Sequence, residues 1–480
     1  MNREIVFDCS PDLIRAAVIE DGKLCELHQE RRNEQKLTES LFLGKVCQIR
    51  PSVHAAFLDV GLELNGFLPL DERTDESLRC GDLIIVQGAA KQATETKGLR
   101  LTRQINLAGK WLVLVPGADE VHVSKKVKQP ELRSALLEMA EEVRPEGCGL
   151  IVRTASQEIS QETLREDASM LLNNWREIER KASGMVQPGI LSERVSLDKR
   201  LLRDLGDQRL SRVVTNQSSH AAQLLQLQQK AIMPQTTRIE WFQEQNQLVF
   251  DAFQLEDKAE RALRRHVWLD CGGYLIIESC EAMTVIDVNS GKMMLGRSLE
   301  ENALRVNLEA AQEVARQIRL RDIGGMIVVD FIDLAEEAHR QQLLEAMRDA
   351  VKTDRAQVHV YGLTKLGLME MTRKRVHAEL RKTLRGSCSY CSGVGEVLLP
   401  EETARRALTQ VRRMAIAGQR GPFAVKLPSE AAKALSQMTA PEGIEVYIIT
   451  NPRGHAEKYA IEQWELTAKR PEGVLRMKKG

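Results

Sequence analysis

The segment 274–334 most narrowly limits the fold of this chain, because two apolar strand patterns flank one long helical pattern. The strand patterns are MTVIDVN and GGMIVVDFIDL, in which runs of β-branched residues end at Asp287 and Asp330. Between them, SLEENALRVNLEAAQEVARQIRLRDI begins with a capping box and repeats apolar residues at helical spacing. A strand, a helix and a second strand form a right-handed βαβ unit whose parallel strands end at one edge of the sheet. The sequence therefore predicts that Asp287 and Asp330 converge.

Two converging carboxylates with no catalytic His or Ser nearby indicate a hard-cation site. Mg²⁺ is commonly held by one or two carboxylates, waters and substrate phosphates, so Asp287 and Asp330 suffice as protein ligands. The amide of Asn289 would orient Asp287 or the scissile phosphate. Alternatives are aspartates that only cap or turn the chain, a nucleotide hydrolase, and a carboxylate pair acting on a sugar. The chain has no G-x-x-x-x-G-K-[ST] motif, which argues against the nucleotide hydrolase.

Composition indicates a globular protein of several domains. The chain has 480 residues, of which 43% are hydrophobic and 28% charged, and its formal net charge is zero. The N-terminal stretch MNREIVFDCSPDLIRAAVIEDG has no continuous apolar run, so we expect no signal peptide, no membrane association and a cytoplasmic location. The nine cysteines are then expected to be reduced thiols or metal ligands.

Two upstream stretches carry candidate contacts to nucleic acid. Residues 40–103 alternate apolar and polar positions with glycine-containing turns, which predicts a small antiparallel barrel of the OB type. Such barrels bind oligonucleotides through aromatic side chains and flanking cations, so Phe57, Phe67 and Lys97 are candidates, although either phenylalanine could equally be barrel core. Further on, Arg153 and Thr154 close the strand pattern GCGLIVRTA. A guanidinium beside a hydroxyl can hold a phosphate there, but the threonine could equally cap the next helix.

Two later stretches also leave alternatives open. The segment MTRKRVHAELRKTLR, residues 371–385, is strongly basic, so it is either a solvated helix face or a phosphate-contacting surface with Arg373 as a candidate substrate contact. Cys388 and Cys391 form an isolated C-x-x-C, which is a redox pair, half of a zinc site or a coincidence. Tetrahedral Zn²⁺ needs four ligands and the chain has no second C-x-x-C. The missing pair would come from a second copy of the protein, with His377 as an alternative ligand.

Several stretches resemble the ribonuclease E/G family. GKVCQIRPSVHAAFLDVGLELNGFLPL resembles the S1 RNA-binding domain of that family, and EAMTVIDVNSG, NLEAAQEVARQIRLRDIGGMIVVDFIDL and GLMEMTRKR resemble motifs of its catalytic domain. The resemblance runs from the N-terminal hairpin to the C-x-x-C and implies a multidomain fold that combines α/β and β structure. Its implied parts are an RNase H-like subdomain at 1–36 and 200–262, an S1 (OB-type) barrel at 37–103, a 5′-sensor at 104–199, a DNase I-like catalytic α/β subdomain at 263–384, a zinc-link at 385–398 and a small C-terminal α+β domain at 399–480.

The same resemblance implies roles for particular residues. The catalytic site would comprise Asp287, Asn289 and Asp330, with Mg²⁺ on the two aspartates. LAGKWLVL and LIVRTA resemble a pocket for the 5′-monophosphate of RNA, and the residues implied in it are Gly109, Val113, Arg153 and Thr154.

The resemblance also implies an assembly. Cys388 and Cys391 would share one structural Zn²⁺ with the same pair of another protomer, which gives a homodimer or a dimer of dimers. Ser389 stands where the family often has proline.

The expected activity is Mg²⁺-dependent cleavage inside single-stranded RNA. It would leave 5′-phosphate and 3′-hydroxyl ends and favour RNA with a 5′-monophosphate. The chain has no long Pro-rich or charged tail, which is typical of the short members of the family and implies maturation of ribosomal RNA and decay of messenger RNA. The alternative is a non-catalytic S1-type RNA-binding protein of the translation apparatus.

Overall fold

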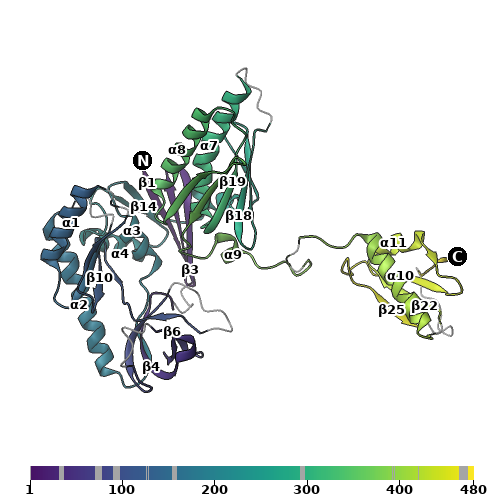
Figure 1. The fold of residues 1–480 in the computed structure, drawn as a ribbon, viewed down its shortest axis with the longest axis horizontal. Helices are drawn as coiled ribbons and strands as arrows, with labels where there is room; N and C mark the ends of the chain where they lie inside the picture. Colours follow the sequence, from purple (N-terminus) through teal and green to yellow (C-terminus); the bar gives the residue numbers. More distant parts are fainter. Residues whose placement is uncertain are drawn as a thin grey trace. The chain divides into compact units, whose positions relative to one another are not determined.

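The fold divides into two compact units, Met1–Thr383 and Leu384–Gly480, which are described separately (Figure 1). This computed structural model describes residues 2–31, 37–70, 78–89, 98–125, 127, 129–153, 159–291, 298–391, 393, 395–419, 421–463 and 474–479. Within these ranges, no helix combines the length and the apolar character needed to cross a bilayer.

The first sheet joins the N-terminal strands to strands from much later in the chain. Its members are β1 (Arg3–Cys9), β2 (Leu13–Glu20), β3 (Lys23–Arg31), β14 (Leu210–Thr215) and β15 (Arg238–Trp241), packed against α3 (Leu197–Leu205), α4 (Ser218–Gln229), α5 (Val249–Ala252) and α6 (Leu255–Arg261). The strand order is β15-β14-β1-β2-β3, and β1 runs parallel to β14. Asp21 and Gly22 make the β2–β3 turn with positive φ angles, which confirms the predicted turn.

The second sheet is the predicted barrel. It comprises β4 (Leu41–Arg50), β5 (Ala55–Asp59), β6 (Gly66–Pro69), β7 (Leu83–Gly88) and β8 (Leu101–Thr102), with β13 (Gly189–Ser192) paired to β4. The order β6-β5-β4-β7-β8 is nearly closed by a bridge between Phe67 and Arg100. Phe42, Leu58 and Leu101 are fully buried in its core, so alternating apolar residues form the interior, as predicted.

The third sheet carries the predicted phosphate pocket. Its strands are β9 (Leu107–Ala108), β10 (Leu112–Pro116), β11 (Val121–Val123) and β12 (Cys148–Val152), in the order β11-β12-β10-β9. The helices α1 (Pro130–Val143) and α2 (Gln161–Gly184) pack against it through one continuous apolar core.

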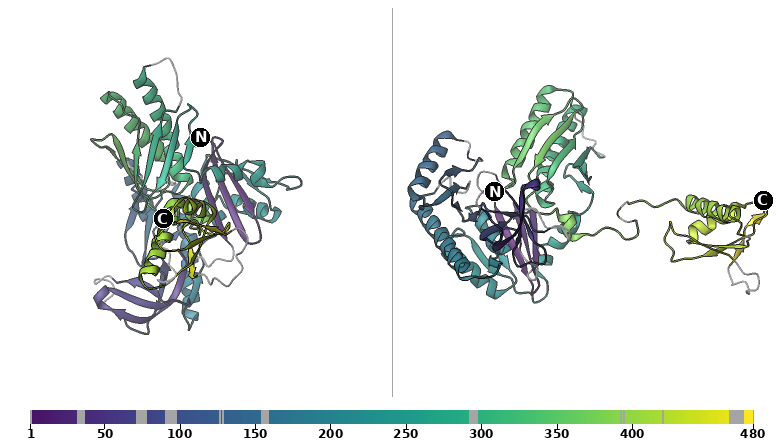
Figure 2. Two further views of the ribbon diagram at one scale, coloured as in Figure 1. Left: turned by 90° about the vertical axis from the view of Figure 1, so that its right-hand side faces the viewer. Right: turned by 60° about the horizontal axis from the view of Figure 1, so that its bottom comes forward.

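The fourth sheet, called the βαβ sheet below, contains the βαβ unit. Its strands are β16 (His266–Trp268), β17 (Tyr274–Ser279), β18 (Met283–Asn289), β19 (Gly325–Asp330), β20 (Val358–Leu363) and β21 (Leu368–Arg373). Their order is β16-β17-β18-β19-β21-β20. Two helices, α7 (Leu299–Leu320) and α8 (Glu337–Ala350), lie side by side on one face (Figures 1 and 2). The capping box is confirmed, because Ser298 Oγ accepts a hydrogen bond from the Glu301 amide at 3.1 Å.

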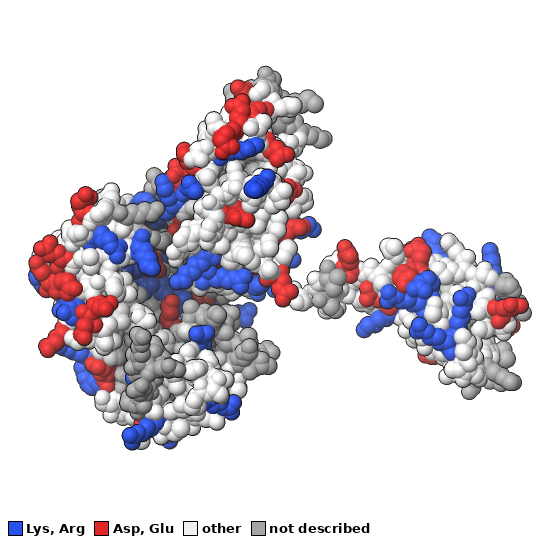
Figure 3. Space-filling model, in the orientation of Figure 1, with Lys and Arg blue, Asp and Glu red and all other residues white. Residues whose placement is uncertain are grey.

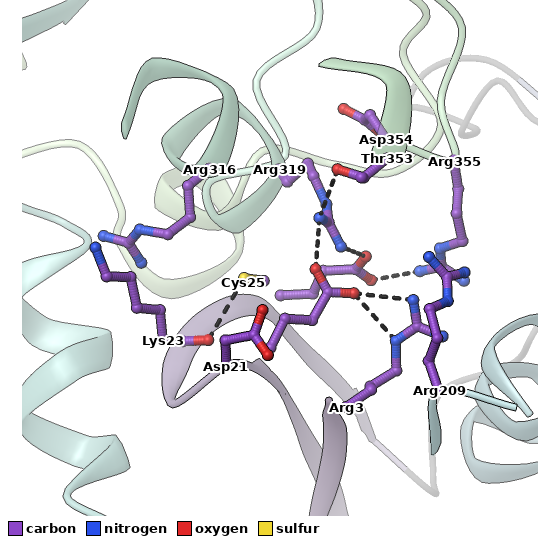
Figure 4. Close-up of polar contacts among 12 residues, drawn as sticks. Arg3, Asp21, Lys23, Cys25, Arg209, Arg316, Arg319, Thr353, Asp354 and Arg355 are labelled. Carbon is purple, nitrogen blue, oxygen red and sulfur yellow. Dashed lines mark hydrogen bonds and ion pairs between the residues drawn. The ribbon is translucent and has the colours of Figure 1, made fainter. Parts of the chain in front are cut away.

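A buried ion-pair network joins the β2–β3 hairpin to the C-terminal end of α7 (Figure 4). Arg319 donates from Nη1 to Glu20 Oε2 at 2.8 Å and from Nη2 to Glu26 Oε1 at 3.0 Å. The other Glu20 oxygen accepts from Arg3 Nη2 at 2.9 Å, and Arg355 pairs with the other Glu26 oxygen. Glu20 and Glu26 thus connect Arg319 to Arg3 and Arg355, and this network fixes the βαβ sheet to the N-terminal sheet.

The second unit has its own small core. It contains α10 (Pro400–Ile416), β22 (Phe423–Leu427), α11 (Ser429–Gln437), β24 (Val446–Thr450), β25 (Ala460–Gln463) and β26 (Leu475–Arg476). The sheet order is β25-β22-β24-β26, with both helices packed on it and a separate pair of β23 (Thr439–Ala440) and β27 (Lys478–Lys479). This agrees with the predicted small C-terminal segment of mixed α and β structure.

Candidate active site

Asp287 and Asp330 occupy equivalent positions on adjacent strands. β18 and β19 run parallel, and their register places Asp287 directly beside Asp330 near the C-terminal ends of both strands. Strands in a sheet are about 4.8 Å apart, so the two carboxylates can reach one ion. Asp287 is half-buried and Asp330 is exposed. The predicted convergence is therefore confirmed.

Asn289 holds one of these carboxylates in place. Its Nδ2 donates to Asp287 Oδ2 at 2.8 Å, which leaves the second carboxylate oxygen of Asp287 available for a ligand. The described residues include no group of three or more His, Cys, Asp or Glu side chains that could hold a metal. Two hard oxygen donors with open positions for water and phosphate fit Mg²⁺ better than Zn²⁺.

The helix α7 fixes the chain segment that leaves Asp330. Asn307 is completely buried, and its side chain donates to the Ile332 carbonyl at 2.7 Å and accepts from the Ile332 amide at 3.0 Å. Glu300 accepts from the amides of Ala335 and Glu336 at 3.1 Å each. Sequence reasoning missed Asn307, although a polar residue on the apolar face of a helix was the signal available.

The structure places only some residues of the predicted phosphate pocket next to one another. Arg153 donates from Nη1 to the Gly109 carbonyl at 2.7 Å and from Nη2 to Asp204 at 2.6 Å, so both terminal nitrogens already have protein acceptors. Val113 is half-buried on β10, next to β12, and Thr154 lies outside the described residues. The structure thus brings Gly109 and Arg153 together with Val113 on the adjacent strand.

A carboxylate explains why glycine occupies position 109. A Cβ atom there would lie 2.7 Å from the Asp167 carboxylate oxygens. That carboxylate is fixed, because its Oδ2 accepts from the amides of Trp111 and Leu112 at 2.9 Å each. Burial also lowers the pKa of the neighbouring Lys110 to about 8, although Asp167 opposes this shift.

The two barrel phenylalanines form a surface pair. Phe57 and Phe67 lie opposite each other on β5 and β6, with ring centroids 5.8 Å apart. Both are half-buried and lie outside the barrel core, and the Arg50 guanidinium lies 5.3 Å from the centre of the Phe57 ring. Lys97 lies outside the described residues. Two aromatic faces beside a cation suit the binding of unpaired bases.

Arg373 differs from its prediction as a substrate contact. Its side chain is buried at the end of β21, where Nε donates to Asp354 at 2.7 Å and Nη1 to Asp322 at 2.6 Å. Because both carboxylates lie far from it in sequence, a run of basic residues gave no indication of these partners. Residues 371–385 also do not form one helix, since β21 ends at Arg373 and α9 covers only Leu380–Leu384.

The C-x-x-C lies at the start of the second unit. Cys388 is exposed, Cys391 is half-buried, and both are free thiols. Hydrogen bonds from the backbone amides of Cys391 and Tyr390 lower the pKa of the Cys388 thiol, which favours the thiolate form that Zn²⁺ binds. The described part of the chain offers Zn²⁺ no cluster of three ligands, so this pair could supply only half of a tetrahedral site.

Comparison with known proteins identifies the family. The Ribonuclease E/G family model matches residues 106–376, which is more than half of the chain. This chain belongs to the ribonuclease E/G family. Ribonuclease G of Salmonella typhimurium (strain SL1344) is 32% identical over 489 residues, covering 96% of this chain and 99% of that protein. Ribonuclease G of Escherichia coli (strain K12) is 33% identical over 91% of this chain and 92% of its own length.

The larger relative matches over a smaller share of its length. Ribonuclease E of Escherichia coli (strain K12) is 31% identical over 96% of this chain but only 46% of that protein. The segment that matches the ribonuclease E/G family model contains Asp287, Asn289 and Asp330 together with Arg153. Within the family, the chain is similar to Ribonuclease G over nearly its whole length.

Proposed function

We propose that this chain hydrolyses phosphodiester bonds inside single-stranded RNA at a Mg²⁺ site formed by Asp287 and Asp330. Its family membership makes it an endoribonuclease of RNA processing and decay. The observation that carries the proposed site is the register that places the two aspartates side by side at one sheet edge. Family membership also favours the enzyme over the alternative of a non-catalytic RNA-binding protein.

The residues of the site would each have a separate task. Asp287 and Asp330 bind the cation, and Asn289 keeps the Asp287 carboxylate turned towards it. Mg²⁺ held by these residues would supply Lewis-acid chemistry, which favours attack of water on the phosphorus. The water oxygen bonds to phosphorus while the bond from phosphorus to the 3′ oxygen breaks. The 3′ oxygen leaves with a proton, so the products are a 3′-hydroxyl and a 5′-phosphate.

Other parts of the first unit would hold the RNA strand. On the face shown in Figure 3, Lys and Arg side chains gather in its middle, between the βαβ sheet and the barrel, while acidic side chains lie mostly towards its margins. Such a distribution attracts the phosphate backbone. The proposed base contacts on the barrel are Phe57 and Phe67, and Lys97 is proposed as the flanking cation.

We propose in addition that the pocket around Gly109, Val113, Arg153 and Thr154 favours RNA with a 5′-monophosphate. For Arg153 to bind a phosphate, it would exchange its contact with Asp204 or share its remaining N–H groups. Precursor ribosomal RNA and messenger RNA, met in the cytoplasm, are the proposed substrates, as similarity to Ribonuclease G implies.

One experiment tests the reaction and the end preference together. Purified protein is incubated with an A/U-rich single-stranded RNA that carries either a 5′-monophosphate or a 5′-triphosphate, in Mg²⁺ or in EDTA. We expect internal cuts only in Mg²⁺, new ends with 5′-phosphates, and faster cutting of the monophosphorylated RNA. Binding without cleavage in any divalent metal would contradict the reaction, and equal rates on both RNAs would contradict the pocket.

The proposed assembly has a test of its own. We propose that Cys388 and Cys391 of two protomers share one Zn²⁺ and so form a homodimer, with a dimer of dimers as the larger assembly. Chelation of zinc should then halve the mass in light scattering, and Cys388→Ser should do the same without a chelator. An unchanged mass with both thiols free would reject the shared site.

A further inference from the structure

A row of aromatic side chains leads from the proposed site to the edge of the βαβ sheet. Asn289 lies directly opposite Tyr274 on β17, and Tyr274 lies directly opposite Trp268 on β16. Residues directly opposite each other in antiparallel strands share a face of the sheet. The row is therefore on the same face as Asp287, and α7 and α8 cover the other face.

The rings of Trp268 and Tyr274 lie next to each other and form one aromatic surface. Their centroids are 5.2 Å apart, and the His266 ring lies 5.8 Å from that of Tyr274. The Trp268 residue is 71% exposed and belongs to none of the apolar cores of the described residues. A tryptophan with this much solvent exposure beside a proposed active site is more typical of a ligand contact than of a packing residue.

The turn behind this pair fixes its position relative to the aspartates. The Cys271 amide donates to both oxygens of Glu309 on α7 at 3.2 Å. Gly291, which follows the site strand β18, packs so closely on this turn that a Cβ atom would lie 2.2 Å from the Gly272 carbonyl oxygen. The β16–β17 hairpin and the chain leaving Asn289 are thus held together.

The nearby charges favour a nucleobase over a phosphate as the occupant. The acidic groups around the pair, Glu278 and Asp270, are matched by Arg265 and by Lys23, which lies 3.7 Å from Asp270. These two described ion pairs therefore add no net positive charge that would attract a phosphate. The exposed surface is aromatic, and every base of an unpaired strand offers a π face to it.

We propose that Trp268 and Tyr274 form a stacking platform for one unpaired base next to the scissile phosphate. This inference rests on the proposed function and assigns the platform to the same substrate. A base inside a duplex is already stacked between its neighbours, so the platform would engage single strands and contribute to their preference. It would position the phosphate over Asp287 and Asp330, and neither aromatic residue takes part in the chemistry.

An abasic scan tests the platform. A 5′-monophosphorylated RNA with one cleavage site is made with an abasic ribose at each nucleotide flanking the cut in turn, and kcat/KM is measured with wild type, Trp268→Ala and Trp268→Phe. Base stacking is worth about 1–3 kcal/mol, so we expect Trp268→Ala to lower kcat/KM roughly 5- to 150-fold. One abasic position should cause a similar loss in wild type and no further loss in Trp268→Ala, while Trp268→Phe should retain most of the rate.

A control and a second readout separate the outcomes. Trp241→Ala, which removes another half-exposed tryptophan from β15, should not change kcat/KM. In EDTA, the fluorescence of 2-aminopurine at the abasic-sensitive position should be quenched by wild type and less by Trp268→Ala or Tyr274→Leu.

The platform would be overturned if the abasic position and Trp268→Ala lowered kcat/KM by independent factors that multiply in the combination. An unchanged rate in a folded Trp268→Ala would also overturn it. A lower mass of Trp268→Ala in light scattering with normal cleavage would make the pair a contact between copies. No cleavage by wild type would instead overturn the proposed function.

Discussion

A single hydrogen bond determines how the proposed site would hold its cation. Asn289 Nδ2 donates to Asp287 Oδ2 at 2.8 Å, and loss of such an orienting contact typically costs about 10- to 100-fold in metal affinity or activity. Asn289→Ala should therefore raise the Mg²⁺ concentration for half-maximal cleavage by about that factor, with the maximal rate largely recovered at saturating Mg²⁺. A Mg²⁺ titration of the cleavage rate measures this. An unchanged midpoint would show that the amide does not position the metal ligand.

Single-residue predictions from the sequence succeeded where the partner was close along the chain. The contact between Asn289 and Asp287 spans two positions, and a polar pair that follows an apolar strand suggested it. Arg373 failed because its carboxylate partners, Asp322 and Asp354, come from other elements that the fold brings to it. Charge in a linear sequence says how basic a segment is and leaves its burial undetermined.

The helix α7 makes a prediction about the segment that follows β19. Asn307 is fully buried and forms both hydrogen bonds to the Ile332 backbone, so Asn307→Leu would leave the amide and the carbonyl of the half-buried Ile332 without this partner. Each unpaired buried group costs about 1–3 kcal/mol. We expect a loss of about 2–4 kcal/mol in the free energy of unfolding, measured with urea, and slower cleavage below the unfolding transition.

Arg305→Leu changes an exposed position of the same helix and should cost less than about 0.5 kcal/mol. Equal stability of Asn307→Leu and wild type would show that α7 does not clamp the chain beyond Asp330.

At the level of elements, periodicity was sufficient for the βαβ unit and insufficient for the aromatic pair. The strands ending at Asp287 and Asp330 and the helix between them follow from local pattern, and the handedness of the crossover then sets the strands parallel. Trp268 and Tyr274 are separated by a turn with two glycines, and their contact depends on the register of that hairpin. The segment HVWLDCGGYLII does not determine this register by itself, because the register also depends on the neighbouring strands.

The molecule as a whole depends on the network that fixes α7 to the N-terminal hairpin. Burial alone would raise the pKa of Glu20, but Arg319 and Arg3 lower it below 4.5. Burial alone would likewise raise the pKa of Glu26, but Arg355, His28 and Arg319 lower it well below 4.5. A carboxylate with a lowered pKa stabilises the fold above its unfolded pKa, and this contribution is lost as the pH falls below about 4.5.

Glu26→Gln should therefore be costly at neutral pH and less costly in acid. Removing one member of a buried ion pair typically destabilises by about 3–5 kcal/mol, and we expect a loss of this size at pH 7. The difference from wild type in urea unfolding should shrink as the pH falls below 4.5. As a control, Glu337→Gln breaks an exposed pair with Arg340 and should cost less than about 1 kcal/mol. A difference that is small at pH 7, or constant down to acid pH, would contradict this role.

The overall arrangement was the part of the fold least accessible from residues alone. β1 pairs in parallel with β14, so the N-terminal sheet requires a partner some 200 positions away that no local pattern specifies. The family resemblance indicated that 1–36 and 200–262 belong together, and the strand order agrees with this. The barrel, by contrast, closes within a short stretch of chain and follows from its alternating pattern.

The most direct test of the account compares the single-turnover cleavage rates of Asp330→Asn and wild type across a range of Mg²⁺ concentrations. Asp349→Asn serves as the matched control, because it removes an exposed carboxylate from α8 on the covered face of the same sheet. Metal-supplied charge stabilisation is worth several kcal/mol, so Asp330→Asn should be slower by at least about 100-fold at every Mg²⁺ concentration while binding RNA as tightly as wild type. Asp349→Asn should cut at the wild-type rate. If folded Asp330→Asn cleaved RNA as fast as wild type, the two aspartates would not form the metal site and the account would be wrong.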